Sequence, residues 1–289
     1  MFAVTGITGN VGGEVARRLL AAHLPVRALV RDARKAENWA ECGCELRVAD
    51  INDPASLTDA FRGADGVFIL VPPNFDPSPD FREARATAAA VSSALEAARP
   101  KRVVYLSTIG TQASRSNLLT QHTIIEQELR KLSVPITFLR PAWYMENSSW
   151  DVPSAEHGAI PSFLQPLDKP FPMIATSDVG SVAAELLQED STAQRIVELE
   201  SQHRVSPNEI AQTFATILGR PVRAEAVPRD TWESLFKSQG MKNPTPRIQM
   251  LDGFNEGWIE FEHGNAGSRK GNVSLKSVLQ KLVASERAS

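Results

Sequence analysis

The chain has 289 residues, of which 42% are hydrophobic, and its formal net charge is −3. This size fits one large α/β domain or one domain with a small appendage, and the charge gives no electrostatic footprint for nucleic acid. A hydrophobic strand pattern begins at the second residue and no apolar run reaches the length of a membrane span, so we expect neither a signal peptide nor a transmembrane helix.

Strands and helices alternate along the first half of the chain, which is the pattern of a parallel sheet. The predicted strands are Phe2–Thr5, Val26–Val30, Glu45–Val48, Gly66–Val71, Val103–Ser107 and Ile136–Leu139. The predicted helices are Val11–Ala22, Ala55–Phe61, Phe81–Ala98 and Leu118–Leu132. Residues 1–150 are therefore expected to form an α/β domain of Rossmann type, with a doubly wound parallel sheet.

The pattern changes in the second half. Residues 151–175 contain five prolines and are expected to be irregular with one short strand, and the basic stretch 267–271 is interpreted as a solvated loop. The other predicted elements are helix Asp178–Gln188, strand Arg195–Glu200, helix Pro207–Leu218 with a capping box from Ser206 to Glu209, strand Val222–Val227, and helices near Arg229–Lys237, Pro246–Trp258 and Leu275–Val283. We expect residues 151–289 to form a smaller α/β cap, interleaved with the first domain and packed over the carboxyl ends of its strands, where ligands bind in open α/β sheets.

A glycine-rich loop joins the first strand to the first helix. Its spacing, Gly6-x-x-Gly9-x-x-Gly12, lets the backbone turn tightly, and the helix N-terminus supplies free N–H groups with a partial positive charge. An ordinary strand-to-helix turn is the alternative interpretation. Because the loop lies in the first βαβ unit, we predict a dinucleotide site there. Its predicted contacts are Gly6, Thr8, Gly9, Asn10, Val11 and Gly12.

The end of the second strand bears on the choice of cofactor. An acidic residue at this point binds the ribose of NAD, whereas an arginine accommodates the 2′-phosphate of NADP. Arg31 is the first polar residue after the strand and favours NADP(H), while Asp32 would serve NAD(H) if the strand ended one residue later. Arg34 and Lys35 lie just beyond, and a solvated charged turn explains them equally well. We predict NADP(H), with NAD(H) as the second choice.

Two further strand ends are candidate cofactor contacts. Asp50 follows the third strand and could accept a hydrogen bond from the adenine amino group, or it could cap the turn before Pro54. The fourth strand ends in Val71, Pro72 and Pro73, whose backbone is expected to run beside the ribose and pyrophosphate. The two prolines indicate a rigid loop with few hydrogen-bond donors.

The chain resembles the NmrA-like family, an atypical branch of the short-chain dehydrogenase/reductase superfamily. The resemblance rests on the stretches Thr5–Gly12, Val30–Asp32 and Val103–Ser107, and on the long stretch from His122 through Glu126 to Pro135–Asn147. It covers most of the chain and is strongest in the first half. It implies either an enzyme that uses NADPH to reduce quinones or triphenylmethane dyes, or a redox-sensing regulator that binds the dinucleotide without turning it over.

The usual proton donor of the superfamily is absent. Its Tyr-x-x-x-Lys motif uses lysine to lower the tyrosine pKa. The chain has two tyrosines, Tyr105 and Tyr144, and neither is followed by lysine four residues later. Aligned on Glu126, the lysine position holds His122 and the tyrosine position holds Leu118.

His122, Ser107 and Tyr144 are the candidate catalytic residues. An unperturbed imidazole pKa of ~6.5 suits proton exchange at neutral pH. His122 also lies on the inward stripe of its helix, so it could be a packed core residue, and the resemblance adds a possible contact with the nicotinamide ribose. Ser107 ends the fifth strand, where its hydroxyl could contact substrate or cofactor. Tyr144 is expected to wall the pocket with Trp143, although both rings could be core under the cap.

These patterns predict a reductase that transfers hydride from NADPH to a quinone-like or other conjugated apolar acceptor. The alternative is a non-catalytic NADP(H) sensor. The five histidines show no metal-ligand spacing, so no metal site is expected. Cys42 and Cys44 lie one residue apart, which argues against a disulfide framework and favours a cytoplasmic protein. The expected partners are small apolar or aromatic molecules, in a monomer or a homodimer.

Overall fold

An eight-stranded parallel sheet organises the molecule. The computed structural model describes residues 1–288, and only the backbone of Asn265. The strand order is β12-β10-β6-β5-β4-β1-β2-β3. The strands are β1 (Phe2–Thr5), β2 (Val26–Val30), β3 (Glu45–Val48), β4 (Gly66–Ile69), β5 (Arg102–Leu106), β6 (Ile136–Pro141), β10 (Arg195–Ser201) and β12 (Arg269–Gly271). The order reverses beyond β1, as in a Rossmann-type sheet, so the predicted fold class is confirmed.

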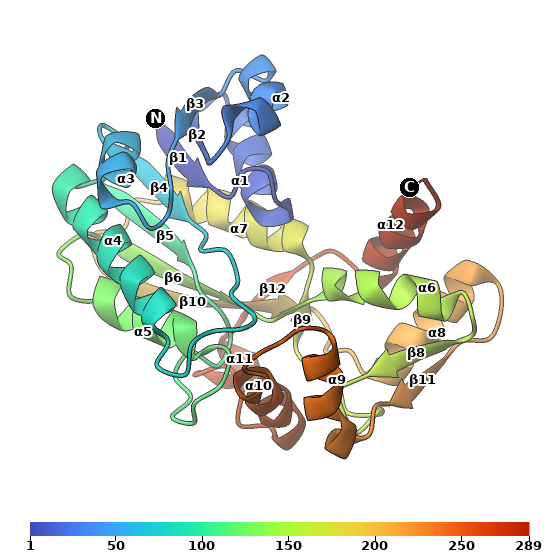
Figure 1. The fold of residues 1–289 in the computed structure, drawn as a ribbon. Coiled ribbons are helices and arrows are strands. Elements are labelled where there is room, and N and C mark those ends of the chain that lie inside the picture. Colours follow the sequence, from blue (N-terminus) through green and yellow to red (C-terminus); the bar gives the residue numbers. More distant parts are fainter. Residues whose placement is uncertain (289) are drawn as a thin grey trace.

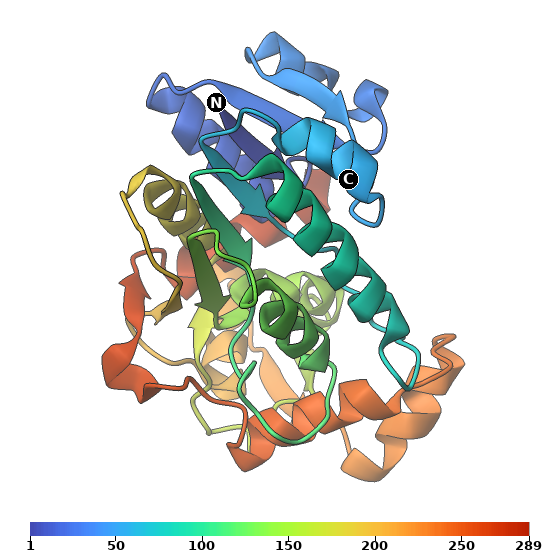
Figure 2. The same cartoon turned by 90° about the vertical axis from the view of Figure 1, so that its left-hand side faces the viewer.

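Helices cover both faces of this sheet. One face carries α1 (Asn10–Ala21) and α7 (Thr176–Gln188), which pack against each other, and the other carries α3 (Pro54–Phe61), α4 (Arg82–Ala98) and α5 (Thr120–Leu129) (Figures 1 and 2). Every residue of β1 and β4 is buried. These strands read as continuous apolar runs because both of their faces are covered.

The remaining elements gather mainly to one side of the sheet, where Figure 1 shows β8, β11, α6, α8 and α9 together. They are α6 (Val152–Ala155), β8 (Ala159–Ser162), α8 (Pro207–Leu218), β11 (Arg223–Ala226), α9 (Trp232–Ser238), α10 (Thr245–Glu256) and α12 (Leu275–Ala288). Short connecting elements are η1 (Ala33–Ala36), α2 (Glu37–Glu41), β7 (Trp143–Tyr144), η2 (Met145–Asp151), β9 (Met173–Ile174), η3 (Arg229–Thr231) and α11 (Gly264–Gly267). The predicted capping box of α8 is confirmed. Among residues 1–288, no helix is long and apolar enough to cross a membrane.

Two sequence interpretations were wrong. Residues 151–175 hold one helical turn and two short strands, α6, β8 and β9, rather than a single strand. The stretch 267–271 is not a solvated loop, because β12 pairs in parallel with β10 at the edge of the main sheet. The buried carboxylate of Glu200 accepts bonds from Ser268 at 2.5 Å and from Lys270 at 2.8 Å, which fixes this basic segment in place. The cause is a tertiary contact that no local pattern reveals.

Candidate active site

The loop between β1 and α1 forms a cradle at the carboxyl edge of the sheet. Gly6 adopts φ +65°, and a Cβ on Gly12 would lie 2.3 Å from the carbonyl oxygen of Gly6, so both positions require glycine. Thr5 Oγ1 accepts a bond from the backbone N–H of Leu70 at 2.7 Å, which ties the loop to the end of β4. Helix α1 has no side-chain cap and no acidic residue in its first turn. Its free N–H groups therefore suit an anion such as a pyrophosphate.

The predicted cofactor residues of this loop lie at the start of α1. Thr8, Gly9 and Asn10 are exposed there, Val11 reaches the large cavity described below, and Gly6 and Gly12 form the close turn. Their contacts with a dinucleotide stay a prediction. The features of the loop nevertheless fit a dinucleotide phosphate: a tight backbone turn, an uncapped helix and no competing carboxylate in the first turn.

Arg31 and Asp32 differ in their surroundings. Arg31 is exposed and makes no hydrogen bond or ion pair within residues 1–288. The Asp32 carboxylate binds the Arg34 side chain at 2.8 and 3.0 Å and also accepts from the Arg34 backbone N–H, and these bonds lower the Asp32 pKa. Asp32 thus already has partners, whereas the Arg31 guanidinium is available to a ligand.

Asp50 serves the turn after β3. Its side chain accepts a bond from the Asn52 backbone N–H at 2.8 Å, which is the turn-capping role weighed for it above. The adenine contact stays a prediction.

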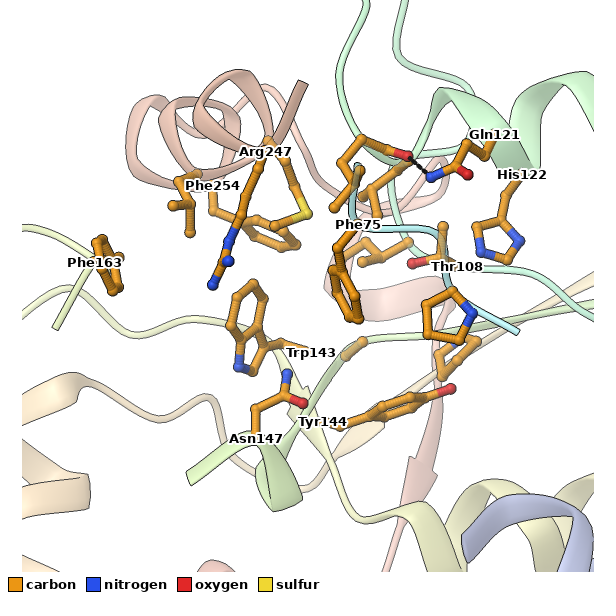
Figure 3. Close-up of a pocket in the computed structure, with 18 of the residues that line it drawn as sticks. Phe75, Thr108, Gln121, His122, Trp143, Tyr144, Asn147, Phe163, Arg247 and Phe254 are labelled. Atoms are coloured by element: carbon orange, nitrogen blue, oxygen red, sulfur yellow. Dashed lines mark hydrogen bonds between the residues drawn. The ribbon is translucent and has the colours of Figure 1, made fainter. Parts of the chain in front are cut away.

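A cavity of about 770 Å³ opens at the carboxyl ends of β4, β5 and β6. Val11 reaches it from the start of α1, so the cavity adjoins the glycine cradle. The predicted residues Val71, Pro72, Pro73, Ser107, His122 and Tyr144 all line it. Aromatic walls come from Phe75, Trp143, Phe163 and Phe254 (Figure 3), with the Trp143 and Phe254 rings edge to face at 5.3 Å. The cavity lining is therefore mostly apolar, with polar side chains as the minority, as ligand sites usually are.

His122 is held by a tyrosine that the sequence did not connect with it. The Tyr105 hydroxyl lies 2.8 Å from His122 Nδ1, and Tyr105 is fully buried. Either group can donate in this pair, and in the tautomer in which the Tyr105 hydroxyl donates to Nδ1, the imidazole proton lies on Nε2. Burial lowers the His122 pKa to about 4. The ordinary value assumed from the sequence is therefore too high, and the ring is neutral at pH 7.

Ser107 belongs to a buried charge cluster. Its hydroxyl donates to Glu126 Oε1 at 2.6 Å, and Arg140 binds both oxygens of the same carboxylate at 2.7 and 2.9 Å. Although burial opposes it, the bonds from Arg140, Ser107 and Arg130 lower the Glu126 pKa. The hydroxyl proton of Ser107 is thus donated to Glu126, and a substrate contact by Ser107 stays a prediction.

Four further ionisable residues line the cavity, namely Glu83, Tyr144, Asp151 and Arg247. Burial raises the pKa of Tyr144, with a smaller effect of the Glu146 charge, so the phenol is neutral at pH 7. Burial raises the pKa of Asp151 to about 7, although a hydrogen bond from Ser148 opposes the change. Arg247 enters the cavity from α10 (Figure 3). Asp151 and Arg247 were missed by the sequence reasoning because neither lies in a motif.

Comparison with known proteins agrees with this geometry. The chain is 28% identical over 259 residues to an NAD(P)H azoreductase of Xenophilus azovorans, covering 89% of this chain and 85% of the relative. It is 26% identical over 246 residues to quinone oxidoreductase 2 of Escherichia coli (strain K12), covering 83% and 82%. The structure of Citrobacter sp. triphenylmethane reductase complexed with NADP(H) superposes with a TM-score of 0.80 at 25% identity, covering 97% of this chain and 99% of that one.

The predicted cofactor class agrees with the NADP(H) of that complex. The profile of the NmrA-like family matches residues 1–266, which includes the cradle, the cavity walls and the Glu126 cluster. The resemblance inferred from the sequence is confirmed: the chain belongs to the NmrA-like family.

Proposed function

We propose that the protein is an NADPH-dependent reductase of flat, conjugated acceptors of the quinone or azo type. The observation that carries the proposal is the apolar, aromatic-walled cavity of about 770 Å³ adjoining the glycine cradle. Relatives named as an azoreductase and a quinone oxidoreductase support the same class of acceptor.

The residues of the cradle fit NADP(H). The α1 N-terminus would hold the pyrophosphate, and Arg31 the 2′-phosphate, because a guanidinium forms charge-assisted bonds with phosphate. Asp32 is bound by Arg34, which leaves its carboxylate fewer acceptor sites for the ribose hydroxyls. When bound, the cofactor supplies a hydride; with one proton from solvent, this hydride reduces a quinone to a hydroquinone.

The residues of the cavity orient the acceptor and exclude water. Trp143 and Phe254 offer apolar faces to a flat ring, so an acceptor can be held without a covalent step. Neutral His122 carries a proton on Nε2 and can donate a hydrogen bond to an acceptor oxygen as negative charge develops there. Tyr105 is a positioning residue in this scheme, because its hydroxyl selects the imidazole tautomer.

The test is NADPH oxidation, followed at the nicotinamide absorbance band, with a panel of neutral quinones and azo dyes. Turnover with at least one conjugated acceptor is expected. If the protein binds NADPH tightly and reduces none of them, the enzyme proposal fails and the sensor alternative stands.

The role of His122 has its own test. We expect His122→Ala and Tyr105→Phe each to lower kcat for quinones by about 10-fold or more, because a donor to the developing oxyanion is lost or misoriented. His157→Ala is the matched control, since His157 is exposed and hydrogen-bonds the Pro153 carbonyl. Unchanged kcat in both test variants would return His122 to a packing role.

A further inference from the structure

Arg247 brings a positive charge into an apolar cavity. It is the third residue of α10, and its guanidinium lies over the Phe236 ring, 4.3 Å from the centroid. Figure 3 shows its side chain pointing between Phe163 and Trp143, on the opposite side from His122. Burial lowers the Arg247 pKa and no neighbouring carboxylate offsets that effect. The protein thus keeps a cation where the surroundings disfavour one.

The acidic residues of the same helix have other partners. Asp252 binds Arg229 at 2.6 Å, and Glu256 binds Arg115 at 3.1 Å. Within residues 1–288, Arg247 makes no hydrogen bond and no ion pair. Stacking occupies the face of the guanidinium, while its N–H groups lie in the plane and are free to bond.

The position of Arg247 on its helix also disfavours a cation. The first turn of a helix carries a partial positive charge, which repels arginine and attracts anions. The Pro246 carbonyl accepts a bond from the Leu118 backbone N–H at 2.8 Å, so this turn is anchored to the segment that leads into α5 and His122. This hydrogen bond therefore fixes the first turn of α10, which carries Arg247, relative to the cavity.

We propose that Arg247 binds an anionic substituent of the acceptor, so that the preferred substrates are conjugated aromatic molecules carrying a carboxylate, sulfonate or phosphate. This inference rests on the proposed function and adds the substrate class. The flat rings would pack among Trp143, Phe163 and Phe254, with the anion at the far end of the cavity from His122. Cationic dyes of the triphenylmethane type would be disfavoured, because their charge would face the same guanidinium.

The kinetic test compares a neutral naphthoquinone with the same quinone carrying a sulfonate group. The measured quantity is kcat/KM for the sulfonated quinone divided by kcat/KM for the neutral quinone. Comparing this ratio between the wild type and a variant removes the effect of the two quinones' different reduction potentials. We expect Arg247→Gln to lower this ratio about 10-fold or more, and Arg247→Lys to lower it less. Arg115→Gln, which removes an exposed arginine paired to the same helix, should leave the ratio unchanged.

A binding test does not depend on turnover. Calorimetry on NADP⁺-loaded protein would compare naphthalene-2-sulfonate with 2-naphthol, and the sulfonate should bind about 10-fold more tightly than the naphthol, with the difference lost in Arg247→Gln. An unchanged kinetic ratio, or equal binding of the two compounds, overturns the anion site. No turnover with either quinone, together with selective sulfonate binding, would overturn the proposed reductase and keep the anion site.

Discussion

Two groups of charged side chains near the carboxyl ends of β5 and β6 have opposite environments. In the cluster around Ser107, Glu126 and Arg140 are both buried and bonded to each other through two hydrogen bonds. In the cavity, Arg247 has no ionic partner within residues 1–288, and burial drives Asp151 toward its neutral form. A buried charge with all its partners fixes the structure, whereas an unpartnered charge facing a cavity is available to a ligand. The same residue type therefore serves stability in one place and recognition in the other.

The largest expected effect is a loss of stability when the Glu126–Arg140 pair is broken. Arg140→Met removes both bonds to Glu126 and leaves a buried carboxylate with Arg130 and Ser107 alone, so we expect a loss of about 3–5 kcal/mol in the free energy of unfolding. Urea denaturation measures it. Arg223→Met, at an exposed arginine paired with Glu225, should change stability by about 0.5 kcal/mol or less. A small loss for Arg140→Met would contradict a structural role for the cluster.

The next largest effect concerns Arg31, the exposed arginine directly after β2. Arg31→Ala should weaken NADPH about 10- to 100-fold and NADH much less, because a charge-assisted contact with the 2′-phosphate is lost. Titration of each cofactor by fluorescence measures the two dissociation constants. Arg62→Ala is the control, since Arg62 is an exposed arginine paired with Asp59 and lies outside the predicted cofactor residues. Equal losses for NADPH and NADH with Arg31→Ala would remove the 2′-phosphate assignment.

The contributions of His122 and Asp151 to the free energy of unfolding should depend on pH in opposite directions. With a folded pKa of about 4, His122 binds fewer protons than in the unfolded chain, so its contribution to stability falls as pH drops below its unfolded value of ~6.5. Asp151, with a folded pKa of about 7, holds a proton that the unfolded chain releases, so its contribution falls as pH rises from ~4 toward 7.

Between about pH 5 and pH 6.5 the two slopes should cancel in the wild type. Asp151→Asn should then gain stability with rising pH, and His122→Asn should lose it, each by at most about 1.4 kcal/mol per pH unit. Urea midpoints across this range measure the slopes. Parallel curves for all three proteins would show that neither pKa is displaced.

The smallest expected effect is a gain in stability, opposite in sign to the loss expected for Arg140→Met. Arg247→Met makes the same substitution as Arg140→Met, but at an arginine with no ionic partner, so stability should rise by about 1 kcal/mol or less. Thermal unfolding of the cofactor-free protein measures it. A loss comparable with that of Arg140→Met would show that Arg247 is a structural residue.

Much of the fold could be predicted because its strands and helices carry their own patterns. The bounds of β1, β2, β3 and α8 are those expected from the sequence. The strand β12 could not be predicted, since three residues rich in basic side chains have no strand pattern, and Glu200 holds them from a distant part of the chain. Local patterns thus located the elements that local propensity specifies and missed β12, which tertiary contacts hold in place.

The candidate site divides in the same way. The glycine loop and Arg31 belong to a short, contiguous motif, so residue spacing was enough to point to them. The Tyr105–His122 pair joins a strand to a helix, and Arg247 enters from an element near the end of the chain. Their proximity, and the displaced pKa of His122, follow from packing. The sequence therefore predicted a dinucleotide cradle more readily than the chemistry beside it.

The sheet edge at β12 has a consequence for biosynthesis. The strand is made from residues 269–271, and α12, which follows it, packs against η2, the segment that carries Asn147 and Asp151 into the cavity. On the ribosome, the cradle and the inner strands emerge long before these pieces. A nascent chain can thus form the cofactor half early, while the acceptor wall stays incomplete until residues 269–288 have left the exit tunnel. Premature termination in this stretch would separate dinucleotide binding from acceptor selection.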